Sequence, residues 1–315
     1  MTQRPVEALP AGRDDPSRRR VVLVLTHTGR VEAVLAASEL LHRLSEAGFT
    51  PAMLAQEARD LPDAPAGTMV VQDPAQTVLE AELVLVLGGD GTILRAAELV
   101  RGGSAPLLGV NLGHVGFLAE SEREDLAEAV DRLATRDYVV EERMTLDVLV
   151  TLRGEELART WAVNEASVEK ANRQRMLEVV TEVDGRPVST IGCDGVVMAT
   201  PTGSTAYAFS AGGPVVWPEV EALLMVPISA HALFARPLVV APTSVLAVEV
   251  LDRASAGVLW CDGRRTAELP PGARIEVRRS AEPVRLARLA TGPFTDRLVA
   301  KFRLPVTGWR GPVDR

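Results

Sequence analysis

The stretch LVLGGDGTILRAA at residues 85–97 decides the fold. Its apolar run ends at a pair of glycines, a carboxylate follows at Asp90, and a segment with helical character opens with Gly91 and Thr92. A buried strand that passes through a glycine turn into a helix is the repeating unit of a parallel α/β sheet. We therefore expect a strand over 82–88 and a helix that begins at Thr92.

Strands and helices alternate on both sides of this stretch. Further strands are predicted at 21–25, 50–56 and 106–111, and helices at 31–47 and 121–134. The last helix is acidic and amphipathic, and it opens with Ser121 and Glu124 at the spacing of a capping box. This alternation predicts one parallel α/β sheet up to about residue 137.

The sequence changes character after that point. Strand-like segments follow one another with little helix between them, and DGRP at 184–187 is a turn signal that joins two of them. We expect an α/β domain over 20–137 and a β-rich domain over 138–290. Residues 1–19 are expected to form a disordered arm, and the apolar residues of 291–315 to pack on another part of the chain.

Composition and charge limit the classes of partner. The 315 residues include 34 Lys and Arg against 42 Asp and Glu, and nothing in a net charge of −8 indicates a nucleic-acid binder. No apolar run reaches the roughly 18–20 residues that cross a bilayer, and the N-terminus lacks the apolar core of a signal peptide. Cys193 and Cys261 are too few for a disulfide framework or a zinc site. We expect a cytoplasmic protein with reduced thiols that binds neither nucleic acid nor membrane.

The glycine turn around Asp90 lies where parallel sheets bind ligands, beyond the carboxyl end of a strand. Gly91 and Thr92 could hold phosphate oxygens, because glycine admits close backbone approach and a helix N-terminus favours negative charge. The turn is neither a Walker A loop nor GxGxxG. A carboxylate about 4 Å from a phosphate costs roughly 4 kcal/mol at an effective dielectric near 20. Asp90 therefore either holds a divalent cation, or takes the proton of an acceptor hydroxyl, or only caps the helix.

Three other segments have the composition of binding loops. They are NLGHVGFLAE at 111–120, the polar pair Asn164–Glu165 inside a strand pattern, and GCDGVVMATPTGSTAYAFSAGGP at 192–214. The last combines many hydrogen-bond donors with little side-chain bulk and suits a polyphosphate or a dinucleotide, with Tyr207 available to cover a flat ring. Asp262, in a second Cys-Asp-Gly turn, is expected to end a strand rather than to take part in chemistry.

Taken together, these segments resemble the NAD kinase family, whose members phosphorylate the 2'-hydroxyl of NAD with ATP or polyphosphate. The motifs that carry the resemblance are GGDGT at 88–92, NLGHVGFL at 111–118, NE at 164–165, CDGVVMATPTGSTAYAFSAGGP at 193–214, PISAHALFARPLVV at 227–240 and WCDGR at 260–264. The likeness extends from about residue 20 to 310 and is greatest to actinobacterial members. It implies a Rossmann-like N-terminal α/β domain with the GGDGT loop, a C-terminal β-sandwich-like domain, and a C-terminal tail that returns to the N-terminal domain.

The resemblance also implies roles for single residues. Asp90 matches the general base that takes the proton of the adenosine 2'-hydroxyl. Ligand contacts are implied for Gly91 and Arg95, for the nucleoside-binding pair Asn164 and Glu165, and for Arg175, Asp194, Thr205, Ala206, Tyr207 and Ser210.

The implied cofactor is a divalent cation, Mg²⁺, on the donor phosphates, with no protein residue assigned as its ligand. Gly192 stands where family members restricted to ATP carry a bulkier polar residue, which favours polyphosphate as a second donor. The implied assembly is a homodimer or homotetramer. Two alternatives remain: a lipid or sugar kinase with the same GGDGT turn, and a dinucleotide sensor without catalysis.

Overall fold

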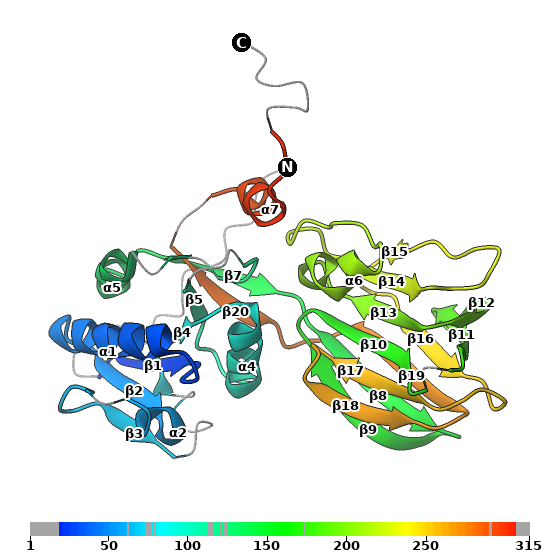
Figure 1. Ribbon diagram of the computed structural model, residues 1–315, viewed down its shortest axis with the longest axis horizontal. Helices are drawn as coiled ribbons and strands as arrows, with labels where there is room; N and C mark the ends of the chain where they lie inside the picture. Colours follow the sequence, from blue (N-terminus) through cyan, green and yellow to red (C-terminus); the bar gives the residue numbers. More distant parts are fainter. Residues whose placement is uncertain are drawn as a thin grey trace, which may run out of the picture. The chain divides into compact units, whose positions relative to one another are not determined.

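The chain divides into two compact units. A computed structural model describes residues 19–61, 63–72, 77, 80–112, 116–119, 121–122, 125–172, 174–289 and 292–306. The first unit comprises Met1–Glu142 and Arg285–Arg315, and the second comprises Arg143–Val284 (Figure 1).

The first unit is built on one eight-stranded sheet with the order β3-β2-β1-β4-β5-β20-β7, and β6 pairs with β5 off this path. Its strands are β1 (Val21–Thr26), β2 (Thr50–Leu54), β3 (Met69–Val71), β4 (Leu83–Leu87), β5 (Leu107–Asn111), β6 (Ser121–Glu122), β7 (Val139–Arg143) and β20 (Val284–Arg288). Its helices are α1 (Val31–Glu46), α2 (Ala55–Ala58), α4 (Asp90–Val100), α5 (Leu126–Ala134) and α7 (Phe294–Phe302). The strands from β3 to β5 are parallel, which confirms the Rossmann-like prediction.

Helices cover both faces of this sheet. Alternate side chains of β1, β4 and β5 share one buried cluster with α1 and α5. On the opposite face of β5, Gly109 leaves room for Ile93 of α4, because a Cβ at residue 109 would lie only 2.5 Å from Ile93 Cδ1. Every residue of β1, β4 and β5 is buried, as expected for strands covered on both sides.

The helix predicted over 121–134 is shorter than expected. Ser121 pairs with Val110 in a parallel ladder as part of β6, and α5 begins only at Leu126. Ser121 therefore lies in a strand rather than directly before α5, and the predicted capping box with Glu124 falls outside the described residues. The strand predicted over 50–56 likewise ends at Leu54, where α2 follows.

The second unit is a sandwich of two six-stranded antiparallel sheets. One has the order β15-β14-β13-β10-β17-β18 and the other β12-β11-β16-β19-β8-β9. The first sheet contains β10 (Glu165–Lys170), β13 (Gly195–Ala199), β14 (Leu223–Ile228), β15 (Leu238–Val240), β17 (Gly257–Cys261) and β18 (Arg265–Leu269). The second contains β8 (Leu146–Leu152), β9 (Glu155–Ala162), β11 (Leu177–Val183), β12 (Arg186–Cys193), β16 (Leu246–Val250) and β19 (Ala273–Arg279). The inward residues of both sheets form one core, which confirms the β-sandwich prediction.

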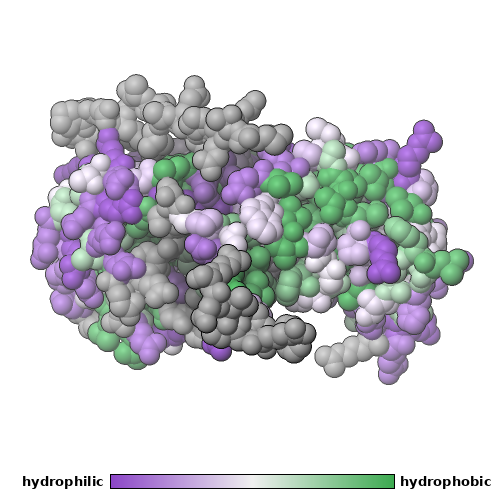
Figure 2. All heavy atoms as spheres, turned by 90° about the horizontal axis from the view of Figure 1, so that it is seen from above, coloured by the Kyte–Doolittle hydropathy of each residue, from purple (hydrophilic) through white to green (hydrophobic). Residues whose placement is uncertain are grey.

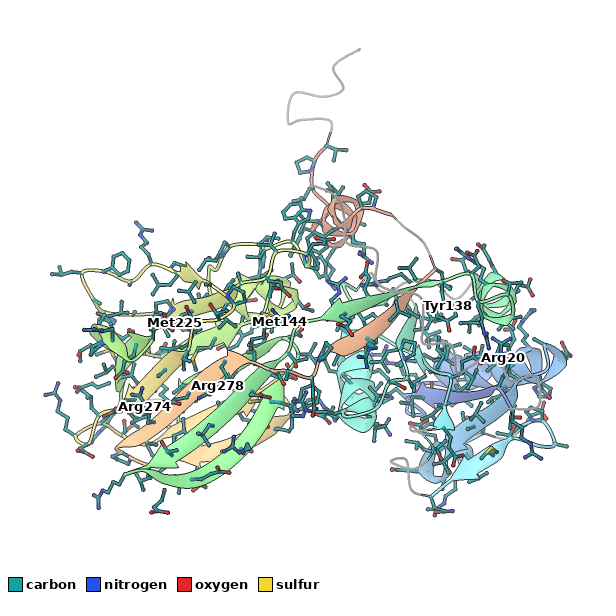
Figure 3. All side chains as sticks on the ribbon, turned by 180° about the vertical axis from the view of Figure 1, so that it is seen from behind. Arg20, Tyr138, Met144, Met225, Arg274 and Arg278 are labelled. Atoms are coloured by element: carbon teal, nitrogen blue, oxygen red, sulfur yellow. The ribbon has the colours of Figure 1, made fainter. Side chains whose placement is uncertain are left out.

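Charged side chains cover the outer face of the second sheet. Arg274 and Arg278 lie along β19 (Figure 3), and Arg274 pairs with Glu182 at 2.8 Å and Glu276 at 3.1 Å. Hydrogen bonding to Glu182 is the main reason that the pKa of Arg274 is raised. This face is a cross-strand ion network, so its acids are already paired.

The boundaries between the two units differ from those predicted from the sequence, at 137–138 and 290–291. Both β7 and β20 were expected in the β-rich domain, but they join the sheet of the first unit. In the predicted tail, α7 packs on Phe117 of the first unit, with ring centroids 5.6 Å apart for Phe294 and 5.8 Å apart for Phe302. The predicted turn at Asp184–Gly185 joins β11 to β12, and both residues have positive φ. Residues 1–18 and 307–315 lie outside the described residues.

Candidate functional site

The GGDGT turn connects β4 to α4, as the sequence predicts. Gly88 has a φ of +152°, and a Cβ there would lie 2.5 Å from Thr92 Oγ1, so only glycine fits. The helix begins at Asp90 rather than at Thr92, with Gly89 as its N-cap. Asp90 and Gly91 therefore form the first turn of α4, where backbone N–H groups have no acceptor within the helix.

The Asp90 carboxylate is held by the next loop. Its Oδ2 accepts the N–H of Phe117 at 3.2 Å, and its Oδ1 accepts the N–H of Leu118 at 3.1 Å. A Cβ on Gly116 would lie 3.0 Å from Asp90 Cγ and closer still to Oδ1, so this glycine lets the loop approach the acid. Both carboxylate oxygens thus have fixed directions, and each keeps a second lone pair for another partner.

Arg95, one turn further along α4, is tied to a buried acid that sequence reasoning missed. Its Nη1 lies 2.9 Å from Oε1 of Glu57, and Oε2 of Glu57 accepts the N–H of Thr26 at 3.1 Å. Glu57 is only 2% exposed. Burial raises the pKa of Glu57, while the Thr26 amide and Arg95 oppose that shift. The pair fixes Arg95 beside the carboxyl end of β1.

In the second unit, Asn164 and Glu165 lie at the start of β10 and are both buried. Glu165 is only 7% exposed, yet its Oε2 has no hydrogen-bond partner among the described residues. Burial raises the pKa of Glu165 to about 8, with smaller contributions from the charges of Asp262 and Glu169, while the backbone N–H of Tyr207 lowers it. A buried acceptor without a partner is costly and marks a place for a ligand donor.

The glycine-rich segment after β13 packs directly on this pair. Thr200 Oγ1 donates to the carbonyl of Val163 at 2.7 Å, and its N–H donates to the carbonyl of Asn164 at 2.9 Å. Gly203 lies so close to Asn164 that a Cβ would be 2.8 Å from the Asn164 Cα. The short helices η2 (Thr202–Thr205) and α6 (Tyr207–Ser210) follow.

These contacts bring several predicted residues together. Thr205 and Ala206 are half-buried, whereas Tyr207 and Ser210 are exposed. Burial raises the pKa of the Tyr207 phenol, and the charges of Glu169, Glu165 and Asp194 add to that effect. The Tyr207 phenol therefore lies within the electrostatic influence of three carboxylates.

The remaining two predicted residues of this unit differ in their surroundings. Asp194 pairs with Lys170, whose hydrogen bond is the main reason that the pKa of Asp194 is lowered. Arg175 is exposed in the connection between β10 and β11. Asp90, Gly91 and Arg95 belong to the first unit, and the other eight predicted residues belong to the second. Among the residues that the structure describes, no group of three or more His, Cys, Asp or Glu is arranged to hold a metal ion.

Comparison with known proteins gives concordant matches over both units. The model for the ATP-NAD kinase N-terminal domain matches residues 17–138, and that for the ATP-NAD kinase C-terminal domain matches residues 163–289. The chain is 62% identical to NAD kinase 2 of Streptomyces coelicolor over 295 residues, covering 94% of this chain and 98% of the relative. It is 63% identical to the NAD kinase of Leifsonia xyli over 300 residues, covering 94% and 99%.

A solved structure supports the fold. The crystal structure of yeast NADH kinase complexed with NADH superposes with a TM-score of 0.81 at 23% identity, covering 92% of this chain and 88% of that chain. The fold, the two domain models and the identity to full-length relatives agree, and the chain belongs to the NAD kinase family.

Proposed function

We propose that this protein transfers a phosphoryl group from ATP to the 2'-hydroxyl of the adenosine ribose of NAD, with Asp90 as the general base. The observation that carries the proposal is the Asp90 carboxylate in the first turn of α4, which the backbone amides of Phe117 and Leu118 hold in place. The chain that carries it belongs to the NAD kinase family. Such a carboxylate has a fixed direction and a free lone pair, as a base aligned on a hydroxyl requires.

The proton and the bonds balance in one displacement. As the ribose oxygen forms its bond to the terminal phosphorus of ATP, the bond from that phosphorus to the bridging oxygen breaks and ADP leaves with the electron pair. The hydroxyl proton passes to Asp90. Backbone N–H groups at the start of α4, including that of Gly91, are suited to hold the negative phosphate oxygens.

The nucleoside is assigned to the second unit. Oε2 of Glu165 can accept a hydrogen bond from a ribose hydroxyl, since it has no partner among the described residues. Asn164 and Asp194 supply further polar groups, and Tyr207 offers an exposed ring. Thr205, Ala206 and Ser210 complete the assigned contacts, and Arg95 and Arg175 are assigned to phosphate or to another part of the ligand.

A divalent cation, Mg²⁺, is assigned to the donor phosphates. The chain fits such a role, because Mg²⁺ is commonly bound by substrate phosphates with only one or two carboxylates, and Asp90 is the acid in this turn. When bound, the cation neutralises charge on the transferring phosphoryl group. If Asp90 instead serves mainly as a cation ligand, Asp90→Asn should need a higher Mg²⁺ concentration and recover activity there, which a lost general base would not allow.

The proposed activity has a direct test that also addresses the donor. Purified protein is incubated with NAD and Mg²⁺, with ATP in one tube and inorganic polyphosphate in the other, and NADP is measured at the end point. NADP with ATP supports the kinase, and its absence from folded protein refutes it. NADP with polyphosphate supports the proposed second donor: a Cβ on Gly192 would meet only Met176, at 3.4 Å, so this position has room beside it.

Self-association is proposed as a homodimer or homotetramer, and residence in the cytoplasm is proposed as well. Figure 2 shows hydrophobic side chains gathered over the second unit. Exposed apolar residues there include Val188, Leu233, Phe234 and Val239, and exposed clusters of this kind commonly mark protein interfaces. Light scattering after gel filtration tests the assembly, since a monomer at all concentrations would refute it.

Every helix among the described residues is too short or too polar to cross a membrane.

A further inference from the structure

Asp262 lies in the turn between β17 and β18, where the sequence suggested nothing more than the end of a strand. Asp262 and Gly263 both have positive φ, at 54° and 63°, so the chain reverses tightly there. The Asp262 side chain nevertheless points into the protein, and the residue is only 7% exposed. An acid buried to this degree needs hydrogen-bond or charge partners that offset the free-energy cost of removing it from water.

Those partners are the backbone groups of the bend before β10. The Asp262 carboxylate accepts the N–H of Val163 at 2.9 Å and that of Asn164 at 2.7 Å, with a longer contact of 3.4 Å from the N–H of Glu165. In return, the backbone N–H of Asp262 donates to the carbonyl of Glu165 at 3.0 Å. Side chain and backbone of one residue thus fix the conformation of the Asn164–Glu165 pair.

Asp262 is itself anchored by Arg265. The Nη2 of Arg265 lies 2.6 Å from Oδ2 of Asp262, and the guanidinium lies 4.5 Å above the ring of Trp161. The ion pair and the ring contact limit the movement of the carboxylate.

The same turn occurs elsewhere in this unit without such a connection. Asp184 also precedes a glycine in a hairpin and has a φ of 53°. Its carboxylate accepts the N–H of Val245 at 2.8 Å and the hydroxyl of Ser244 at 3.1 Å, at an exposed position. Asp184 therefore provides a matched control, because it makes similar bonds to Ser244 and Val245 instead of to the bend that holds Asn164 and Glu165.

We propose that Asp262, anchored by Arg265, is a positioning residue that sets the orientation of Asn164 and Glu165 toward the nucleoside. The proposal rests on the nucleoside-binding role assigned to that pair under the proposed function. In Asp262→Asn an amide NH2 group takes the place of one carboxylate oxygen, so a donor faces either the guanidinium of Arg265 and the N–H of Val163 or the N–H groups of the bend, and the bend must then shift. A shift of about 1 Å in a binding group can cost roughly 100-fold in rate.

The proposal has an electrostatic consequence that a purely structural role would not have. The pKa of Glu165 is affected by the charges of Asp262 from the turn after β17 and Glu169 of β10 and by the backbone N–H of Tyr207 from α6, and the Tyr207 phenol and the Cys261 thiol also interact with it. Because the charge of Asp262 raises the pKa of Glu165, its removal should lower that pKa. If the ionised Glu165 accepts a ribose hydroxyl, NAD affinity rises with pH as Glu165 ionises, and this rise should move to lower pH in Asp262→Asn.

The experiment compares wild type, Asp262→Asn, Arg265→Gln and the control Asp184→Asn. NAD affinity is measured by titration calorimetry between pH 6 and pH 9, and turnover is measured with ATP. We expect NAD affinity to fall about 10- to 100-fold in Asp262→Asn and less in Arg265→Gln, with the KM for ATP unchanged and the pH midpoint lowered in Asp262→Asn. Asp184→Asn should match wild type in NAD affinity.

Each outcome decides something. If Asp262→Asn does not fold, Arg265→Gln carries the test by the same comparison. NAD affinity in the folded variants within twofold of the control, or an unshifted pH midpoint in Asp262→Asn, overturns the positioning role. Wild-type protein that binds NAD but forms no NADP refutes the proposed function instead. The NAD affinities of the variants still test the positioning role of Asp262 in that case.

Discussion

Gly203 is the position at which the smallest change should do the most damage. An added Cβ would lie 2.8 Å from the Asn164 Cα and closer still to its carbonyl carbon and oxygen. Carbon atoms in contact prefer about 3.5–4.0 Å, so the two segments must separate by at least about 0.7 Å. Neither segment is free to move, because Gly203 donates to Thr200 at 3.0 Å and Asn164 donates to Asp262 at 2.7 Å.

The expected cost of Gly203→Ala follows from that separation. Overpacking a rigid site costs about 1–3 kcal/mol. At about 2–4 °C per kcal/mol for a domain of this size, the Tm should fall by roughly 2–12 °C. A displacement of about 1 Å beside Glu165 should lower kcat/KM for NAD by as much as about 100-fold.

The assay combines thermal unfolding with initial rates at varied NAD and saturating ATP. Gly292→Ala is the control, because a Cβ there would meet open space and its φ is not in the left-handed region. The control should behave as wild type. A Gly203→Ala protein with unchanged Tm and kcat/KM within twofold of the control would refute the claim that this close approach holds the site together.

Three other expectations follow from buried contacts. Phe302→Ala removes a ring that packs on Phe117, whose amide holds the base; we expect about 1–2 kcal/mol lower stability by urea denaturation and a lower kcat with little change in NAD affinity, and an unchanged kcat would contradict this. The pKa of Glu165, raised to about 8, means that its contribution to stability is complete below pH 4.5 and is lost as pH rises through 8. Ligand-free protein should therefore lose stability over that range relative to Glu165→Gln, by at most about 1.4 kcal/mol per pH unit, and parallel curves would speak against it. Burial raises the pKa of Cys193 and Cys261 to about 12 each, so neither thiol of the native protein should react with a disulfide reagent at pH 8, and rapid labelling of either would show the burial to be incorrect.

Local signals in the sequence were enough for the parallel sheet and the glycine turn. The run that forms β4, the glycine pair after it and the helix that carries Arg95 lie within 20 residues of one another, and each element has its own pattern. The hairpin at Asp184–Gly185 was predictable for the same reason, because this dipeptide favours positive φ. The family motifs nominated the site residues, and their individual roles stay predictions.

Contacts between distant parts of the chain were not predictable in this way. The bond from Val163 to Asp262 spans 99 residues, and the bond from Thr26 to Glu57 spans 31, so neither acid differs locally from an ordinary turn or helix residue. The pairing of β7 and β20 in the first sheet depends equally on strands remote in sequence. Ser121 shows the same limit, since it pairs with β5 although its local pattern favoured the start of a helix.

The central claim is that Asp90 takes the proton of the 2'-hydroxyl of NAD, and Asp90→Asn tests it most directly. The measurement is the single-turnover rate of NADP formation from MgATP, together with NAD affinity by calorimetry on the same protein. We predict a rate at least about 100-fold below wild type with NAD affinity within a few-fold, because general-base catalysis contributes that much while binding depends on other groups. Near-normal turnover in Asp90→Asn would contradict the account.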